Sequence, residues 1–246
     1  MKNKSEYIKF ILPLLIIFFW FIFTYTGKVP PTSLPSLSAV KDTFIEMLKS
    51  GQLSNDLSLS LRRVLAGFFI SSVLGISLGI FMGISPKAKE FFQLTLTAIR
   101  QIPMIAWIPL IILWAGIGEV SKIVVILFAA TFPIVVNTMG GVDSTSETYL
   151  EVAKMYGLSK KDTFFKVYLP SALPNIFTGL RLGLGASWMA VVASELIASS
   201  SGIGYRLNDA RSLMRSDVVI VCMIIIGLVG LLMDKLIVLI SHELTP

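Results

Sequence analysis

The sequence has few of the residues on which catalysis and metal binding depend. Its 246 residues include 1 cysteine and 1 histidine, and only 15% of them are charged. The lone Cys222 excludes a disulfide within the chain, and His242 has no cysteines or carboxylates at metal-ligand spacing around it. No nucleophile stands at a recognisable spacing from a general base. We therefore expect no metal, no cofactor and no catalytic residue in this chain.

A phosphate-binding loop is missing as well. The pattern G-x4-G-K-[ST], whose backbone amides hold nucleotide phosphates, occurs nowhere in the sequence. The stretch GIGYR at Gly202 has two glycines at the spacing of a nucleotide fingerprint, but it lacks the strand and helix that such a site needs. Any ATP used by this protein is therefore expected to be bound and hydrolysed by another subunit.

Long apolar runs without charge are what the sequence has in abundance. Hydrophobic residues make up 54% of the chain, and the mean hydropathy is +0.80. A helix of about 20 apolar residues crosses a bilayer core of about 30 Å. We therefore predict an all-α integral membrane protein, with a single transmembrane domain over residues 1–246. Its six spans are expected at about 8–25, 64–84, 92–113, 123–139, 172–198 and 217–240.

The first span resembles a signal peptide, and the third span contains two prolines. Lys2, Lys4 and Lys9 precede the first run, as in a cleaved signal peptide. The run is long for such a peptide, however, and no small-x-small cleavage pattern follows it, which favours an uncleaved span. Pro103 and Pro109 interrupt the third span, and each is expected to bend it because proline removes a backbone donor.

Two other patterns predict local structure. Residues from about 38 to 49 alternate as an amphipathic helix, which is expected to lie on the membrane surface. Gly75, Gly79 and Gly83 stand four residues apart in the second span. Glycines at this spacing form a smooth groove, so we expect another helix to approach closely there.

A polar segment separates the fourth span from the fifth. Residues 147–156 can form a helix, and Gly157 suits the left-handed position at its end. Ser159 can cap a second helix to about residue 168, with Asp162 as a capping-box partner, and Pro170 is expected to end that helix. Helices this short are not stable alone in water, so the pair at 147–168 needs something to dock against.

The spacing of this segment resembles a known family. Glu151, Ala153, Gly157, Leu169 and Pro170 follow the pattern E-x-A-x3-G-x9-V-x-L-P. The pattern is similar to the EAA loop of importer permeases in the ATP-binding-cassette superfamily, with valine at two of the apolar positions of that motif. The stretches SLRRVLAGF, RQIPMIAWIPLIILWAGIGEVSKI, FPIVVNTMGGV and SSSGIGYRLNDAR resemble permeases of the nitrate, sulfonate and taurine branch. The resemblance implies the MetI-like fold of type I importers.

The resemblance also implies partners. They are a second copy of the permease, with which it forms the translocation pathway, two cytoplasmic ATP-binding subunits, and an extracytoplasmic substrate-binding protein. The resemblance gives the five motif residues the role of coupling to the ATPase through the loop at 147–170. The net charge of +6 forms no concentrated patch, which suits lipid headgroups and predicts no nucleic-acid partner.

The orientation and the substrate follow from the same resemblance. Basic residues divide equally between the two sides, so charge counting leaves the orientation open, although the lysines before the first span favour a cytoplasmic N-terminus. The EAA loop is cytoplasmic in this family, which implies a multi-pass protein of the cell membrane with both termini in the cytoplasm. The expected substrate is a small anion such as a sulfonate, taurine or nitrate. A vitamin or pyrimidine precursor is the alternative within this branch.

Four polar or aromatic residues are candidates for the pathway or its gate: Arg100, Asn137, Trp188 and Glu195. Arg100 is the natural cation for an anion, unless its side chain reaches to the membrane interface instead. Glu195 would repel an anion, so its expected role is a gate or a salt-bridge anchor at the outer mouth, with a plain interfacial carboxylate as the alternative.

The loop after the fifth span is a candidate for docking the binding protein. It combines glycines that allow unusual turns with one aromatic residue and two arginines: Gly202, Gly204, Tyr205, Arg206 and Arg211. The alternative is a plain connecting loop with basic residues at the membrane interface.

Two other classes of membrane protein are alternatives to an importer permease. An ion-coupled secondary transporter typically shows inverted repeats and ionisable residues at the midplane, and neither is visible in this sequence. A structural membrane protein without a pathway has no reason to keep the spacing of the EAA segment, and it would have no ATPase partner.

Overall fold

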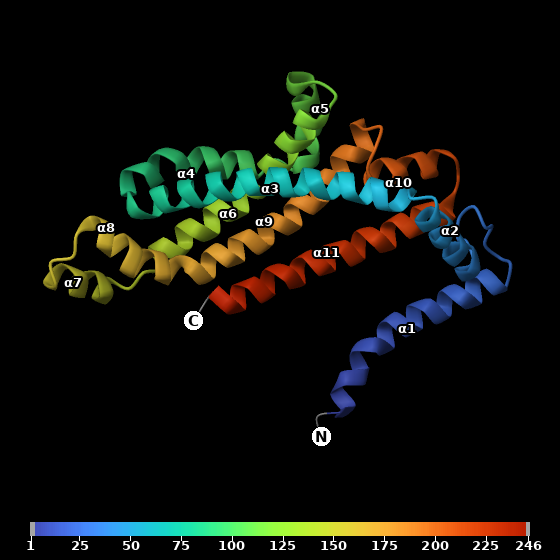
Figure 1. The fold of residues 1–246 in the computed structure, drawn as a ribbon, viewed down its shortest axis with the longest axis horizontal. Helices are drawn as coiled ribbons and strands as arrows, with labels where there is room; N and C mark the ends of the chain where they lie inside the picture. The colour runs from blue at the N-terminus through green and yellow to red at the C-terminus, as the bar shows by residue number, and fades with distance from the viewer. Residues whose placement is uncertain (1–2, 245–246) are drawn as a thin grey trace.

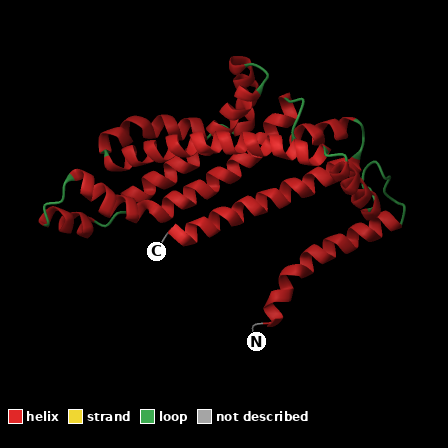
Figure 2. Ribbon diagram, viewed as in Figure 1, coloured by secondary structure: helices red, strands yellow, loops and turns green. Residues whose placement is uncertain are grey.

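The protein is helical throughout the part that its structure, a computed structural model, describes, namely residues 3–244, where no strand occurs (Figure 2). The helices are α1 (Asn3–Tyr25), α2 (Leu37–Lys49), α3 (Gln52–Ile84), α4 (Pro86–Arg100), α5 (Met104–Ala115), α6 (Glu119–Asp143), α7 (Glu147–Met155), α8 (Lys160–Thr163), α9 (Leu169–Ala198), α10 (Ile203–Ser212) and α11 (Ser216–Leu244). A π-helical turn, Phe164–Tyr168, joins α8 to α9.

Three long helices form the centre of the molecule. Helix α6 packs along both α3 and α9, and α11 lies against α9 on the far side from α3 (Figure 1). Helix α4 runs back along α3, whereas α5 projects away from the bundle and α1 leaves it at the opposite edge (Figure 1). Helices α7 and α8 lie at one end of the bundle, and α2 and α10 lie at the other (Figure 1).

The glycines of α3 allow α6 to pack at short range, as the sequence predicts. A Cβ atom added to Gly75 would lie 2.7 Å from Ile134 Cγ2, and one added to Gly79 would lie 2.6 Å from Thr138 Cβ. Gly83 meets Val142 in the same way, at 2.6 Å from its Cβ. No real side chain fits at such distances, so the spacing of four residues produces a seam along which the two backbones approach closely.

The predicted third span is not one straight helix. It consists of α4 and α5, which are joined at 101–103 and bent by 98°. Pro103 precedes α5 and cannot continue the hydrogen-bond ladder of α4, whereas Pro109 lies inside α5 without ending it. The predicted bend is therefore confirmed next to Pro103, and for Pro109 it stays a prediction.

The lengths of the remaining helices fit a membrane protein. Within residues 3–244, four helical segments are long and apolar enough to cross a bilayer, and the bent pair α4 and α5 makes a fifth if it crosses as one broken span. In α1 the apolar part is Phe10–Tyr25. Helix α3 begins at Gln52, twelve residues before the predicted span, and Asp56 and Ser60 in its first turns bond to Arg206 and Glu195 at that end of the bundle. The count of six spans stays a prediction.

The amphipathic helix predicted at 38–49 is confirmed as α2, whereas its place on the membrane surface stays a prediction. Ser36 caps it by accepting a hydrogen bond from the amide of Ala39 at 3.2 Å. Val40 and Met47 are buried from this helix, and Thr43 donates a hydrogen bond of 2.7 Å to Asp217 at the start of α11. Helix α2 is therefore fixed to the bundle as well as amphipathic.

Candidate functional site

The polar segment at 147–170, which we call the coupling segment, begins with α7. Ser146 precedes this helix in extended conformation, and Glu147 in its first turn lies near the positive end of the helix dipole. At the other end Gly157 has φ +66°, and the amides of Gly157 and Leu158 donate to the carbonyls of Lys154 and Ala153, at 3.0 Å each. This is a Schellman termination, and the left-handed turn predicted for Gly157 is confirmed.

The second half of the coupling segment differs from the prediction in one respect. Ser159 caps α8 as expected, accepting from the amide of Asp162 and donating to its carboxylate. Pro170, however, does not end a helix. It occupies the first turn of α9, where a proline needs no intrahelical donor, and a π-helical turn carries the chain from α8 into α9 without a break. The motion of α8 is therefore tied to the long helix α9.

The surface of the coupling segment is apolar on one side. Ala153 is buried, whereas Glu151 on the same helix is exposed. Large apolar side chains of this region stand open to the surroundings: Tyr149, Val152, Met155 and Tyr156. A hollow of about 540 Å³ lies between α7 and the start of α9, and residues on both sides of it line its walls, Pro170 among them. Within the described chain nothing covers this apolar face.

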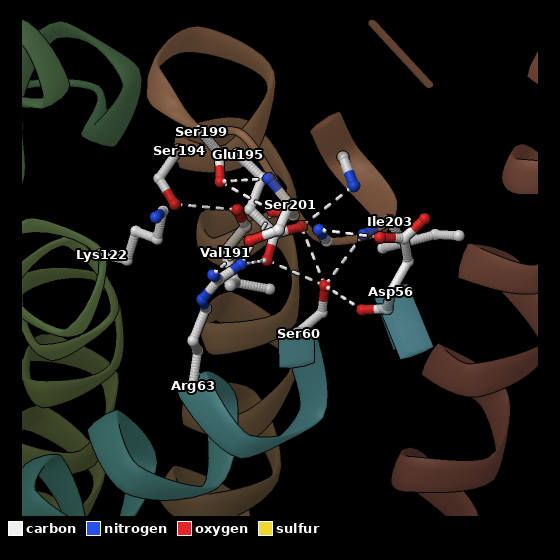
Figure 3. A network of polar contacts seen from close by, with 12 residues as sticks. Asp56, Ser60, Arg63, Lys122, Val191, Ser194, Glu195, Ser199, Ser201 and Ile203 are labelled. Atoms are coloured by element: carbon white, nitrogen blue, oxygen red, sulfur yellow. Dashed lines mark hydrogen bonds and ion pairs between the residues drawn. The ribbon is translucent and has the colours of Figure 1, made fainter. Parts of the chain in front are cut away.

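The opposite end of the bundle holds a largely buried set of charges (Figure 3), of which the side chain of Glu119 is 60% exposed. We call it the charge network; it has three acids and three bases, namely Asp56, Glu119, Glu195, Arg63, Lys122 and Arg206. At its centre, Glu195 Oε1 accepts from Arg63 Nη1 at 2.6 Å and from Ser60 Oγ at 2.8 Å. The amide of Gly204 donates to Glu195 Oε2 at 2.9 Å. Glu195 is 1% exposed and Arg63 is 3% exposed.

The arginine at the centre of the charge network is shared by two helices. Arg63 also binds Glu119 through two hydrogen bonds, 2.7 Å from Nε and 2.6 Å from Nη2. It donates to the carbonyl of Ser201 at 3.0 Å. Lys122, itself 5% exposed, lies 3.4 Å from Glu119. The network therefore joins α3, α6 and α9 to the loop before α10. Because buried charges are stable only when paired, it fixes their relative positions.

The predicted docking loop belongs to this network instead of forming an open surface. Gly202 and Gly204 are buried, and a side chain at Gly202, where φ is +106°, would collide with the carboxylate of Glu195. Arg206 donates to Asp56 at 2.9 Å. The docking prediction is therefore wrong for these two glycines, which make room for a buried carboxylate. Arg206 is held inside the chain, Tyr205 is half-buried, and Arg211 is exposed.

Of the pathway candidates, two lie in the interior. Trp188 is buried in the core, and its Nε1 donates to the carbonyl of Ile226 on α11 at 2.9 Å. Its burial and its hydrogen bond to a neighbouring helix favour a packing role, so its place in a pathway stays an untested prediction. Glu195 is the salt-bridge anchor described above. Its sequence position gave no indication of Arg63, 132 residues earlier, as its partner.

The other two pathway candidates meet in one pocket. Arg100 and Asn137 both line a pocket of about 400 Å³ at the break between α4 and α5. A further pair was not predicted: Arg181 on α9 binds Asp234 on α11, at 2.5 Å from Nε and 2.7 Å from Nη2. Among the described residues no group of three or more histidine, cysteine, aspartate or glutamate side chains could hold a metal ion.

Comparison with known proteins identifies the family. Residues 71–245 match the family described as binding-protein-dependent transport system inner membrane component. A Bacillus subtilis protein with the name of an aliphatic sulfonates transport permease is 38% identical over 234 residues, which are 95% of this chain and 85% of that protein. The taurine transport system permease protein of Escherichia coli is 32% identical over 240 residues, 96% of this chain and 87% of its own.

A further relative and the solved structures agree with this. The nitrate import permease protein of Synechocystis is 38% identical over 187 residues, 76% of this chain and 68% of its own. A chain of an amino acid ABC transporter, crystallised with histidines, superposes with a TM-score of 0.67 at 16% identity, and covers 82% of this chain and 98% of its own. The expected importer-permease fold is thereby confirmed. The chain belongs to the family of binding-protein-dependent transport system inner membrane components, and it is the transmembrane permease subunit of an ATP-binding-cassette importer.

Proposed function

We propose that this permease is driven by a separate ATPase that docks on the coupling segment. The observation that carries the proposal is the uncovered apolar face of α7 and the adjoining hollow of about 540 Å³. A short helix laid into a groove of a partner is a common mode of recognition, and it supplies the contacts that a nine-residue helix lacks by itself. Glu151, Ala153, Gly157, Leu169 and Pro170 keep their predicted coupling role in this proposal.

The coupling segment connects α7 to the long helix α9, so a movement of α7 would be transmitted along α9. Gly157 fixes the angle between α7 and α8, and the π-helical turn makes α8 continuous with α9. Helix α9 carries Glu195 of the charge network in its last turns, about 40 Å from Leu169 at 1.5 Å per residue. Movement of α7 by the closing ATPase would therefore act on the far end of the bundle through one element.

Two copies of the permease are proposed to form the pathway between them. Between 17% and 39% of the apolar windows of the four long segments is buried inside the chain, so most of their surface is left to lipid or to another subunit. A substrate-binding protein is proposed to deliver the substrate at the end that carries α10. Arg211 and Tyr205 remain candidates for contacting it, since Arg211 is exposed there.

The proposed orientation places α7 and both termini in the cytoplasm of a cell-membrane protein. The C-terminal end of α11 points toward the half of the bundle that carries α7 (Figure 1). A reporter fused after Lys161 should therefore be cytoplasmic, and one fused after Arg211 should be extracytoplasmic. The reverse result would contradict both the orientation and the ATPase-docking role of the coupling segment.

The proposed substrate is a small anion such as a sulfonate, taurine or nitrate, in line with the names of the three relatives. The test is uptake into proteoliposomes that contain the permease and its ATPase, with the binding protein outside. Uptake should require ATP inside and the binding protein outside. Uptake that an ion gradient drives without ATP would support a secondary transporter and overturn the proposal.

A further inference from the structure

The pocket at the break between α4 and α5 has an aromatic wall. Trp107, Phe128 and Phe132 all line it. The ring centroids of Trp107 and Phe128 are 5.4 Å apart, and those of Phe128 and Phe132 are 6.4 Å apart, so the three rings form a continuous surface. The volume of about 400 Å³ lies within the range of small-ligand sites.

One cationic side chain lines this apolar pocket. Of the described residues that line it, Arg100 alone carries a charge. Four other arginines, Arg63, Arg181, Arg206 and Arg215, are each bonded to a carboxylate. For the guanidinium of Arg100 the described chain shows neither an ion pair nor a hydrogen bond, as for the exposed Arg62 and Arg211, which lie outside the pocket.

The position of Arg100 in the fold explains why an unpaired guanidinium there indicates a ligand. Helix α4 begins at the end of the bundle that carries α7, and Lys89 in its first turns pairs with Asp143 at the end of α6. Arg100 closes this 15-residue helix, about 16 Å beyond Lys89 at 1.5 Å per residue. Its side chain is exposed in the isolated chain at the break between two apolar helices. A cation within a membrane-spanning segment is normally paired, so an anionic ligand is a partner that fits.

Asn137 supplies a second polar group in the pocket. One hydrogen of its amide donates to the carbonyl of Pro133 at 2.8 Å, which fixes the orientation of the side chain. The other amide hydrogen and the carbonyl oxygen remain for a ligand. Helix α5 begins at the same wall with Met104, and the positive end of its dipole adds to the potential set by Arg100.

We propose that this pocket binds the transported anion within the permease, and that the anion it fits best is a small organic sulfonate. The sulfonate group would lie on Arg100 and Asn137, and its short apolar body would pack against the wall formed by Trp107, Phe128 and Phe132. The aromatic wall favours such an anion over nitrate, which has no apolar part to bury. This inference rests on the proposed function and adds to it a binding site in this chain.

The test is equilibrium binding to the permease–ATPase complex in nanodiscs, without the binding protein. Butane-1-sulfonate and nitrate are titrated by calorimetry. The wild type should bind butane-1-sulfonate more tightly than nitrate. Arg100→Gln should weaken the binding of both anions by about tenfold to a hundredfold, because it removes a charge-assisted contact. Arg100→Lys should restore part of the affinity, and Phe132→Ala should weaken the binding of butane-1-sulfonate alone.

Arg62→Gln is the matched control, since Arg62 is an exposed arginine on α3 outside the pocket, and its affinities should equal those of the wild type. Wild-type affinities in Arg100→Gln, or no binding by the wild type at 10 mM anion, would overturn the pocket inference. ATP-dependent uptake in the proteoliposome assay would still support the proposed function after such a result. Loss of that uptake in the wild type would overturn the proposed function itself.

Discussion

The two ends of this bundle differ in which side chains they bury. At the end with α10, six charged side chains are gathered into the charge network, and its central pair, Arg63 and Glu195, is almost fully buried. At the end with α7, charged residues such as Glu151 are exposed, and the apolar Met155 is 85% exposed. The first end satisfies its own groups, whereas the second leaves an apolar face uncovered.

This difference indicates that the end with the charge network is rigid and that the end with the coupling segment moves. Buried ion pairs have a fixed geometry and are costly to separate, so the charge network keeps four structural elements together as one body. The coupling segment makes few stabilising contacts within its own chain, so contacts with a partner would stabilise it most. Damage to the first end should therefore appear as lost stability, and damage to the second as lost coupling in a protein that still folds.

The largest effect is expected from Arg63→Met. It leaves Glu195 buried without its cation, which should lower the free energy of unfolding by about 3–5 kcal/mol. Thermal unfolding of the purified protein in detergent measures this. Arg62→Met, at the exposed neighbouring position, should change it by less than about 0.5 kcal/mol. Equal stability of the two variants would show that the charge network does not hold this end together.

A smaller loss is expected from Gly202→Ala. The added methyl group would meet the carboxylate of Glu195 at a backbone φ of +106°, and strain of this kind costs about 1–3 kcal/mol. The control is Gly185→Ala in α9, where open space surrounds the Cβ position and alanine favours the helix. The two substitutions should therefore differ in sign in the same unfolding assay, and a stabilised Gly202→Ala would contradict the packing described for this loop.

Gly157→Val should lower the free energy of unfolding by at most about 1–2 kcal/mol, and its main effect should be reduced coupling to the ATPase. A β-branched residue is strained by about 1–2 kcal/mol in the left-handed conformation, so α7 would tilt away from its docking position. ATP-dependent uptake should fall by about tenfold, and capture of the ATPase by the permease should weaken. If both stay at the wild-type level, Gly157 has no part in transmitting the movement of α7.

The smallest effect is expected from Arg211→Glu, at an exposed position near α10. Reversing a rim charge mainly slows association, so stimulation of ATPase activity by limiting binding protein should fall by about two- to tenfold. Stimulation at saturating binding protein should be nearly normal, and Arg211→Lys should resemble the wild type. No change at limiting binding protein would remove Arg211 from the docking surface.

The sequence alone predicts what depends on local periodicity and spacing. The apolar runs predict the long helices, and Gly75, Gly79 and Gly83 predict the seam with α6 because their spacing matches one face of a helix. Gly157 and Ser159 mark the turn between α7 and α8 through their own backbone and capping chemistry. Each of these features is determined within about ten residues of chain.

Features that depend on tertiary contacts were not predictable in this way. The charge network joins residues 132 positions apart, and Arg63 lies beside Arg62 with no local signal to distinguish them. The hydrogen bond of the Trp188 indole was not predictable, because its acceptor lies on α11, 38 residues further along the chain. Pro170 was expected to end a helix, but the π-helical turn before it lets α8 run into α9.

Cross-linking to the ATPase tests the central claim, that the uncovered apolar face of α7 is its docking surface. Met155→Cys, 85% exposed on α7, is compared with Met214→Cys, 74% exposed beyond α10, in complexes with the ATPase. The native Cys222 is buried and should not react. A short bifunctional thiol reagent should join Met155→Cys to the ATPase and leave Met214→Cys unlinked. Cross-links from Met214→Cys, with none from Met155→Cys, would contradict the account.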